Sequence, residues 1–397
     1  MNRNLYRKVE SLLKGDSDFA YFCRFRDNDR ISGEEFLFET EIDPVTFNGN
    51  SRDTIRKGLS DMVESLDDGE LVPTFISYDF VSTVFGLQLR NRSKWPTVSA
   101  IMPSKITKGQ FTRAAATGPV RKLGVATMEK YRREELAHRI AEVRERIREG
   151  ELLQVVLSNR FGVSPFDSAS LLNYFMTNDL SRYVYMFRFN GHEVVGSSPE
   201  SVFVRNGVNV TIDPIAGTRN RDVDANNDTI LIKSLNNDVK EICEHRMLVD
   251  LARNDLARIC SPGTIRVTRD MIPEKFYSVI HLVSQVKGTV RENISPYDLL
   301  ASIFPAGTVS GAPKRRALEI IDKTEDRARG PYSGSVGLLG KEIMDMALTI
   351  RSAFQSQNES FVQAGAGIVK DSVPDTEVDE MIAKADTVIA GGLKCEY

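Results

Sequence analysis

The amino-acid sequence predicts a protein of mixed α+β or α/β class, built on a large and mostly antiparallel sheet system. Three observations carry this prediction. Short runs in which apolar and polar residues alternate, typical of half-buried strands, recur along the chain. Stretches with helical spacing lie between them, chiefly after residue 127. A turn signal at Asn190-Gly191 joins two strand-like runs directly, and a two-residue connection requires antiparallel strands.

The first region of the chain alternates strand-like runs with charged turns. These runs read "FAYFCRFR", "EFLFETEI" and "TFISYDFV". A polar stretch punctuated by Gly and Pro follows and predicts a long connection. We therefore expect an N-terminal structural or regulatory region at 1–105, a linker at 106–126, and a larger region at 127–397 that holds the chemistry-bearing motifs.

The larger region opens with an amphipathic helix. Four apolar residues fall on one face of it: Leu136, Ile140, Val143 and Ile147. We expect Thr127 to cap its start and Gly150 to stop it. Strands are expected at "LLQVVLS", on both sides of the hairpin, and at "VNVTIDPI", "MALTIRSAF" and "SFVQAGAGI". Further helices are expected over 233–250, 313–322 and 376–389.

Composition and charge exclude several classes of function. The chain has 397 residues and a net charge of −3, so no global attraction to nucleic acid or to an anionic membrane is expected. The longest apolar runs fall far short of a membrane span. The four cysteines show neither framework spacing nor a CxxC pair, which favours a reduced, cytoplasmic interior.

Two expected helices carry paired glutamates. Glu241 and Glu244 are three residues apart and share a helix face, and Glu377 and Glu380 repeat this spacing with Lys384 one turn on. Together the four carboxylates could hold Mg²⁺, which prefers oxygen ligands and leaves positions for water or a substrate anion. Taken separately, each pair is more often a solvated helix face. Zinc is less suitable, because neither HExxH nor HxxEH occurs.

Small-residue loops supply a second group of candidates. In "AGTVSGAPK", backbone amides and the Thr308 hydroxyl could bind an anion at a helix start, although the spacing is not that of a P-loop. Gly365 and Gly367 in "QAGAGIV" would let a ligand approach the backbone closely. A structural loop and a tight sheet crossing are the competing interpretations of these two motifs.

Single ionisable residues complete the candidate site. Glu200, in "SSPES", follows a proline at the end of a strand pair and could act as an acid or cap a turn. His281 lies on an apolar strand, where a histidine is more often a satisfied core residue. Arg351 follows an apolar strand, and an arginine buried there needs an anionic partner.

Several long segments carry a resemblance to a known family. They read "PIAGTRNR", "EHRMLVDLARNDLARI", "HLVSQVKG", "AGTVSGAPKRRALEII", "GPYSGSVGLL" and "QAGAGIVKDSVPDTEVDEMIAKA". In this order they closely resemble the chorismate-utilising enzymes, which include the anthranilate, aminodeoxychorismate, isochorismate and salicylate synthases. The resemblance is strong from residue 127 onward and weaker before it. It implies two large, mostly antiparallel sheets that face each other, helices packed outside, and a site in the cleft between the sheets.

The resemblance also implies roles for individual residues. Mg²⁺ would bridge Glu244, Glu380 and a carboxylate of chorismate, with Glu241 and Glu377 nearby. Glu200 matches the acid that protonates the departing 4-hydroxyl. The positions that match residues near the ring are His281 and Thr308. The positions that match other substrate contacts are Gly217, Thr218, Tyr332, Arg351, Gly365, Ala366, Gly367 and Lys384.

Two positions distinguish the branches of the family. Isochorismate and salicylate synthases carry a lysine base in a segment like "KVVLS", where this chain has Gln154. Many aminodeoxychorismate synthases carry a nucleophilic lysine in "PIKGT", where this chain has Ala216. Without either lysine the resemblance implies that ammonia attacks ring carbon C2, and that pyruvate elimination yields anthranilate, at the entry to tryptophan synthesis. An aminodeoxychorismate synthase, which releases no pyruvate, is the alternative.

The resemblance implies two further ligands. Ammonia would come from a separate glutamine amidotransferase subunit, because no Gly-x-Cys-x-Gly segment surrounds any of the four cysteines. Many family members also bind tryptophan as a feedback inhibitor. The matching positions are Glu39 and Thr40 in "FLFET", and Val184, Tyr185 and Met186 in "VYM".

Overall fold

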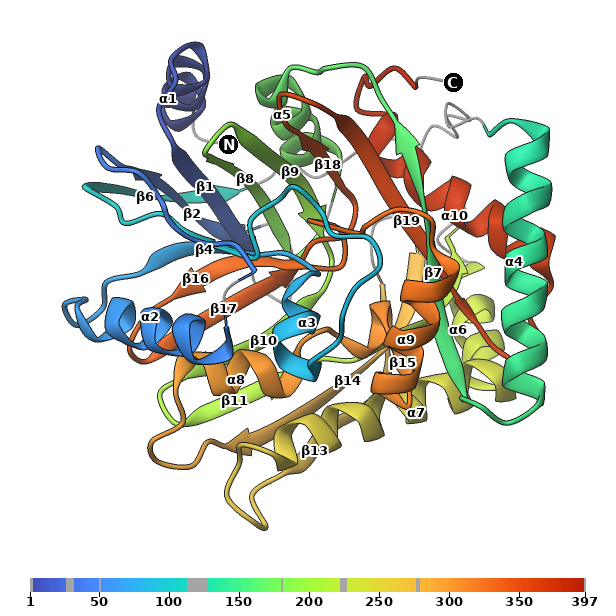
Figure 1. The fold of residues 1–397 in the computed structure, drawn as a ribbon. Coiled ribbons are helices and arrows are strands. Elements are labelled where there is room, and N and C mark those ends of the chain that lie inside the picture. Colours follow the sequence, from blue (N-terminus) through green and yellow to red (C-terminus); the bar gives the residue numbers. More distant parts are fainter. Residues whose placement is uncertain are drawn as a thin grey trace.

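Two antiparallel sheets of nine and ten strands face each other in this protein, with helices on their outer sides (Figure 1). The computed structural model describes residues 3–25, 32–49, 51–112, 128–179, 181–221, 227–275 and 279–395, except for the side chains of Arg3, Thr218, Asn220 and Val279. Every strand pair within these residues is antiparallel. The expected fold is confirmed.

The strands of the two sheets come from all parts of the chain. In spatial order, the nine-stranded sheet contains β15 (Gly311–Ala312), β7 (Gln154–Gly162), β19 (Ser360–Ile368), β18 (Ser352–Gln355), β9 (His192–Ser198), β8 (Tyr183–Phe189), β1 (Phe19–Phe25), β2 (Ser32–Glu39) and β6 (Lys105–Thr112). The ten-stranded sheet contains β12 (Ile215–Asn220), β14 (Val279–Thr289), β11 (Asn209–Ile212), β10 (Ser201–Asn206), β17 (Ile343–Leu348), β16 (Ser335–Leu339), β4 (Val72–Ile76), β5 (Val98–Ala100) and β3 (Val45–Phe47), with β13 (Arg266–Lys275) paired to β14.

The helices cover the outer faces of the sheets (Figure 1). They are α1 (Arg3–Lys14), α2 (Arg52–Glu64), α3 (Phe80–Phe85), α4 (Lys130–Arg148), α5 (Ser168–Asn178), α6 (Asp228–Asn236), α7 (Val239–Ala257), α8 (Pro296–Ile303), α9 (Lys314–Thr324) and α10 (Pro374–Ile389), with the 3₁₀ turn η2 (Gly307–Val309) before α9. Apolar residues of α1, α5 and α10 pack on the nine-stranded sheet. Those of α2, α7 and α8 belong to a second core, which includes residues of the ten-stranded sheet.

A separate aromatic core fills the space between the two sheets. Phe22 and Phe187 from one sheet lie in the same buried cluster as Phe75 and Val336 from the other. The rings of Phe75 and Phe189 are 4.8 Å apart, which brings β4 and β8 into direct contact. Burying large aromatic side chains is the main favourable contribution to holding two such layers together.

Local sequence signals are confirmed at several points. Asn190 and Gly191 both have positive φ, at 48° and 73°, as the two-residue turn of a hairpin between right-twisted strands requires. Gly150 follows α4 with φ at 84°, so it stops the helix in the left-handed conformation that favours glycine. All four apolar residues expected on the inner face of α4 are buried. The proposed cap, Thr127, lies outside the described residues.

Three expected elements differ from the structure. "TFISYDFV" is a strand only to Ile76, and its last two residues, Phe80 and Val81, begin α3. The Phe80 ring packs on the rings of Tyr297 and Phe304. The helix expected over 233–250 is two helices, because Asp238 caps a new helix by accepting from the backbone amides of Lys240 and Glu241.

The run "MALTIRSAF" is not one strand either. It forms β17 in the ten-stranded sheet and β18 in the nine-stranded sheet, with a crossing at 349–351 between them. The Thr349 hydroxyl donates to the carbonyl of Pro331, and Arg351 takes a left-handed φ of 50°. These long-range contacts override the local strand propensity of the run.

The N-terminal region and the larger region expected from the sequence do not form one sheet each. Strands β1, β2 and β6 of the N-terminal region share the nine-stranded sheet with β7, β8 and β9. Residues 106–112 of the expected linker belong to β6, which pairs with β2, and residues 113–126 lie outside the described part. Among the helices described, none has both the length and the apolar character needed to cross a membrane.

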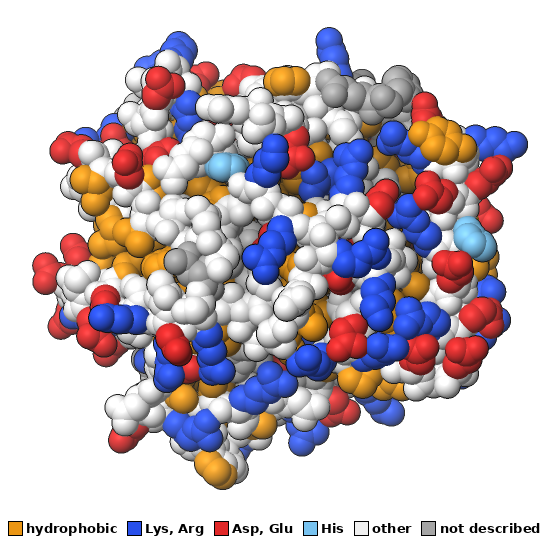
Figure 2. Space-filling model, viewed as in Figure 1, with side chains coloured by type: hydrophobic (Ala, Val, Ile, Leu, Met, Phe, Trp, Pro, Cys, Tyr) orange, Lys and Arg blue, Asp and Glu red, His pale blue; other side chains and the backbone are white. Residues whose placement is uncertain are grey.

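Charged side chains of both signs are interspersed over α4 and α9 (Figure 2). Arg316 of α9, for example, forms ion pairs with Glu319 at 2.8 Å and with Glu151 at 2.5 Å. The helix faces in this view are therefore solvated, mixed-charge surfaces of the kind expected for a chain with a small net charge.

Candidate functional site

Two chain crossings between the sheets define the centre of the site. One runs from β9 to β10 through Glu200, and the other runs from β17 to β18 through Arg351. They lie against each other, because the amide of Leu348 donates to the carbonyl of Glu200 at 3.0 Å and the amide of Ser197 donates to the carbonyl of Arg351 at 3.1 Å. The crossings thus bring together two candidate residues that are about 150 positions apart in the sequence.

Glu200 has the environment of a proton donor. Its side chain is buried, and the Thr308 hydroxyl donates to Oε1 of the carboxyl group at 2.6 Å. Burial raises the pKa of Glu200 to about 7, although Thr308, Lys384 and Arg351 each act to lower it. A carboxylic acid with such a pKa is partly protonated at neutral pH and can give up a proton there.

Arg351 and Tyr332 offer groups that suit an anionic ligand. The half-buried guanidinium of Arg351 has no hydrogen bond or ion pair with any other described residue. A half-buried arginine in this state is a ready partner for a carboxylate. Tyr332 is buried, and burial raises the pKa of its phenol to about 12, so the hydroxyl remains a neutral donor at physiological pH.

Strands β7 and β19 form a floor with two glycines at points where neighbouring atoms leave no space for a side chain. A Cβ atom on Gly365 would lie 2.7 Å from the Tyr332 hydroxyl oxygen and 2.7 Å from the carbonyl oxygen of Leu157. A Cβ atom on Gly367 would lie 2.6 Å from the side-chain nitrogen of Gln154. Ala366, between them, is fully buried in the core, so only its backbone can serve the site. Gln154 Oε1 is buried and has no hydrogen-bond partner among the described residues.

Strand β12, at the edge of the ten-stranded sheet, contributes a bulge. The pairing of β12 with β14 shifts register between Ala216 and Thr218, and Gly217 at the shift has φ of 72°. His281 Nδ1 lies 2.8 Å from the carbonyl oxygen of Gly217, and a carbonyl can only accept. The proton of a neutral His281 is therefore on Nδ1, which leaves the lone pair on Nε2. The side chain of Thr218 lies outside what the structure describes.

Helices α7 and α10 bring the four candidate metal ligands into one electrostatic group. The pKa of Glu244 is raised to about 7, chiefly by burial and in part by the charges of Glu241, Glu377 and Glu380, although Lys240 acts to lower it. Burial likewise raises the pKa of Glu377. Glu241 accepts from Arg219 at 3.1 Å, and Glu380 pairs with Lys384 at 2.6 Å. Four mutually repelling carboxylates are a donor set that a hard divalent cation would stabilise.

The donor set fits Mg²⁺ with help from other ligands. In the described part of the chain, no three acidic, histidine or cysteine side chains converge closely enough to enclose a metal ion on their own. Mg²⁺ commonly binds one or two carboxylates and keeps the remaining positions for water and substrate oxygens. Lys384 joins this region to the floor, because its ammonium also donates to the carbonyl of Gly365 at 3.0 Å.

The residues matched to a tryptophan site are not brought into contact. Strand β1 lies between β2, which ends at Glu39, and β8, which contains Val184, Tyr185 and Met186. These three β8 side chains are fully buried, and the Tyr185 hydroxyl lies 2.9 Å from the Ser352 hydroxyl. Thr40 follows β2, where its hydroxyl donates to the carbonyl of Ile42.

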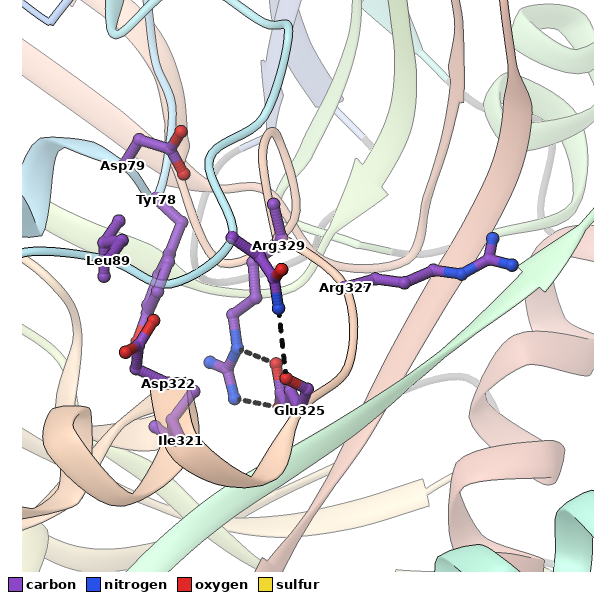
Figure 3. A pocket seen from close by; sticks show the side chains of 10 residues that line it. Tyr78, Asp79, Leu89, Ile321, Asp322, Glu325, Arg327 and Arg329 are labelled. Atoms are coloured by element: carbon purple, nitrogen blue, oxygen red, sulfur yellow. Dashed lines mark hydrogen bonds and ion pairs between the residues drawn. The ribbon is translucent and has the colours of Figure 1, made fainter.

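The sequence analysis missed a buried ion pair beside the site. Arg329 and Glu325 form a two-point ion pair, with nitrogen–oxygen distances of 2.9 and 2.7 Å, next to a small cavity of ≈ 20 Å³ also lined by Tyr78 and Asp79 (Figure 3). Both lie in the charged run "DKTEDRARG", which is typical of a solvated loop. Their four-residue separation was the available signal, and it is a weak one.

The fold is a two-sheet α+β fold, and its candidate site combines an acid, an arginine and paired carboxylates, which are groups that suit a small anionic ligand. Residues 75–390 match the family of chorismate binding enzymes. The chain belongs to this family.

Curated relatives come from the same family. The chain is 44% identical over 259 residues to anthranilate synthase component 1 of Acetivibrio thermocellus, a match that covers 64% of this chain and 52% of the relative. It is 45% identical over 260 residues to anthranilate synthase component 1 of Pseudomonas aeruginosa, with the same two coverages. The chain thus spans about half the length of the curated relatives it matches.

Solved structures share the fold over nearly the whole chain. Anthranilate synthase component I from Streptococcus pneumoniae superposes with a TM-score of 0.72 at 26% identity, covering 94% of this chain and 92% of that one. A putative 2,3-dihydroxybenzoate-specific isochorismate synthase from Bacillus anthracis superposes with a TM-score of 0.74 at 22% identity, covering 96% and 98%. At this lower identity the likeness concerns the fold alone.

Proposed function

We propose that this chain is the chorismate-aminating component of an anthranilate synthase, which converts chorismate and ammonia to anthranilate, pyruvate and water. The observation that carries the proposal is the pair Gln154 and Ala216. These are the two positions at which the resemblance implies a lysine in other branches of the family, and neither residue has an amine, whereas the Glu200–Thr308 pair is present. Glutamine is too weak a base to deprotonate water, and alanine offers no nucleophile, so the nucleophile must be external.

The site residues suit each stage of this reaction. Arg351 and Tyr332 would hold a carboxylate of chorismate through charge-assisted hydrogen bonds. As ammonia forms its bond to C2, Glu200 would donate its proton to the hydroxyl leaving from C4, which departs as water. His281 Nε2 carries a lone pair when neutral and is the candidate base for the ring proton at C2, whose removal accompanies pyruvate loss.

A divalent cation would be held by Glu244 and Glu380, with Glu241 and Glu377 nearby. When bound, Mg²⁺ would supply charge neutralisation for a substrate carboxylate. Lys384, which donates to the carbonyl of Gly365, would then tie α10 to the glycine floor, on which we place the ring. The same contact would keep its ammonium positioned near the substrate.

Product identification tests this proposal. The isolated chain, mixed with chorismate, Mg²⁺ and ammonium, should form fluorescent anthranilate and an equal amount of pyruvate. Formation of an aminated product without pyruvate would instead identify an aminodeoxychorismate synthase. Formation of isochorismate would show that water is the nucleophile and would overturn the interpretation of Gln154.

We also propose that a separate glutamine amidotransferase subunit supplies the ammonia and that the pair works in the cytoplasm. The absence of a Gly-x-Cys-x-Gly segment in the sequence supports this division of labour. The isolated chain should therefore be inactive when glutamine replaces ammonium. Activity with glutamine alone would contradict the separate-subunit proposal and leave the chorismate chemistry untouched.

Feedback inhibition by tryptophan remains a secondary proposal. A tryptophan that touched both Glu39 and Tyr185 would have to lie across β1, so binding should be weak unless the packed aromatic side chains rearrange. Titration of tryptophan into the ammonium-dependent assay measures this directly. We expect inhibition in the millimolar range, and activity unchanged at millimolar tryptophan would discard the proposal.

A further inference from the structure

The ion pair of Arg329 and Glu325 lies at a junction of site-forming segments. Arg329 has 2% of its surface exposed and Glu325 has 8%, so both charges are removed from water. Such burial is costly unless the geometry is good and every donor is used. Arg329 and Glu325 approach each other with two parallel contacts, as Figure 3 shows.

All five N–H groups of the Arg329 guanidinium have an acceptor. Nε donates to Glu325 Oε2 at 2.9 Å, and Nη2 donates to Glu325 Oε1 and to the carbonyl of Val156, both at 2.7 Å. Nη1 donates to the carbonyl of Val309 at 2.7 Å and to the Ser333 hydroxyl at 3.3 Å. Lysine, with three donors on a single nitrogen, cannot reproduce this arrangement.

Each acceptor is next to a residue of the candidate site. Val309 follows Thr308, whose hydroxyl holds the Glu200 carboxyl group. Ser333 follows Tyr332, and Val156 is the strand residue that pairs with Gly367. The partner carboxylate extends this set, because Glu325 Oε1 also accepts from the amide and the hydroxyl of Ser158, the residue that pairs with Gly365.

We infer that Arg329, held by Glu325, is a positioning residue that fixes Thr308 against the Glu200 carboxyl group. The inference rests on the proposed function in one respect only, namely that Glu200 acts as the acid on chorismate. Among the described residues, no hydrogen bond or ion pair joins Arg329 to Glu200. Arg329 acts instead through the backbone, at Val309 of η2 and at Val156 of β7. A displacement of η2 by a fraction of an ångström would lengthen the 2.6 Å bond from Thr308 to Glu200.

A double-mutant cycle between positions 329 and 308 tests the inference. Arg329→Lys should lower kcat for chorismate consumption by about 10²-fold, the scale of loss seen when a reacting group is misplaced by about 1 Å. Thr308→Val should lower kcat as well. In the Thr308→Val background, Arg329→Lys should lower kcat by less than a further factor of about two. The hydrogen bond that Arg329 maintains, from Thr308 to Glu200, is already absent there. Independent, multiplying losses would overturn the inference.

A second readout does not depend on turnover. The carboxyl group of Glu200 can be titrated by ¹³C NMR of labelled glutamate or by infrared spectroscopy, with Glu200→Gln used to assign the signal. Because the Thr308 hydrogen bond lowers the pKa of Glu200, Arg329→Lys and Thr308→Val should both raise it. A purely stabilising role for Arg329 predicts a lower unfolding midpoint with the pKa of Glu200 unchanged, and that result would also overturn the inference.

Two controls complete the design. Arg24→Lys alters a different arginine, which links the two sheets through its ion pair to Asp345 and also pairs with Glu34, and it should leave the pKa of Glu200 unchanged.

If Arg329→Lys does not fold, Arg329→Met/Glu325→Leu removes both charges together. This double variant should also raise the pKa of Glu200. If the wild-type protein makes a product other than anthranilate, the proposed function fails, while the cycle on chorismate consumption still decides the role of Arg329.

Discussion

Glu200→Gln should reduce kcat for chorismate amination by about 10²–10⁴-fold, the usual contribution of a positioned general acid. The amide keeps the size of the side chain and can still accept from the Thr308 hydroxyl, so the site should keep its shape. It has no acidic proton to give to the hydroxyl leaving from C4. Activity within tenfold of the wild type would show that another group is the acid. Steady-state assays of chorismate loss with saturating ammonium and Mg²⁺ provide the measurement.

The pH dependence of the wild type offers a matching signature. Glu200 acts in its protonated form, and its pKa is raised from 4.5 to about 7, so kcat/KM should fall as pH rises above about 7. The raised pKa also means that the folded state binds this proton more tightly than the unfolded chain does. Its contribution to stability is therefore present at low pH and is lost as pH rises from 4.5 to about 7. Glu200→Gln should lack that loss, and should unfold at a higher urea concentration than the wild type at pH 8.

Glu380→Gln should abolish turnover at Mg²⁺ concentrations that saturate the wild type. The substitution removes a carboxylate that we assign to the metal, and it also releases Lys384 from its ion pair. Loss of a ligand should weaken Mg²⁺ binding by at least about 10–100-fold, because this loss is found even when the residue removed only hydrogen-bonds to a ligand. The matched control is Asp379→Asn on the same helix, whose carboxylate pairs with Arg133, and it should leave turnover unchanged. Unaltered activity in Glu380→Gln would remove Glu380 from the metal site.

The pH dependence of Mg²⁺ binding gives a test of the same site without turnover. The pKa of Glu244 is raised to about 7, so below that pH this carboxyl group must lose a proton before it can bind the metal. The dissociation constant for Mg²⁺ should decrease as pH rises toward about 7 and level off above it. Isothermal titration calorimetry in two buffers of different ionisation enthalpy would reveal the released proton. A dissociation constant independent of pH between 5 and 8 would contradict the assignment of Glu244.

Local patterns in the sequence predict the elements of this fold better than their connections. The amphipathic helix before Gly150 and the hairpin at Asn190-Gly191 follow from spacing and turn chemistry alone. The run "MALTIRSAF" reads as one strand because it is short and largely apolar, with the β-branched residues Thr349 and Ile350 at its centre. Its break depends on Gly334 and Pro331 in a separate part of the chain, whose carbonyl groups accept hydrogen bonds from the amide and the hydroxyl of Thr349. No local pattern contains that information.

The same limit applies to the candidate site. Motifs identify Glu200 and Thr308 as separate residues, whereas their 2.6 Å hydrogen bond and the burial behind the pKa of Glu200 depend on how the sheets face each other. Arg329 was missed for a related reason. A charged residue in a charged run is normally solvated, and only the packing of η2 and β7 around it makes it a buried, fully bonded group.

The two adjacent crossings between the sheets also constrain how the molecule can move. The hydrogen bonds from Leu348 to Glu200 and from Ser197 to Arg351 fasten the two crossings to each other at both ends. A shift of one sheet against the other would have to break these bonds before it could change the separation of the acid from the arginine. Helices α7 and α10 have no such tie to either crossing among these bonds, so they could move while the acid and the arginine keep their relative positions.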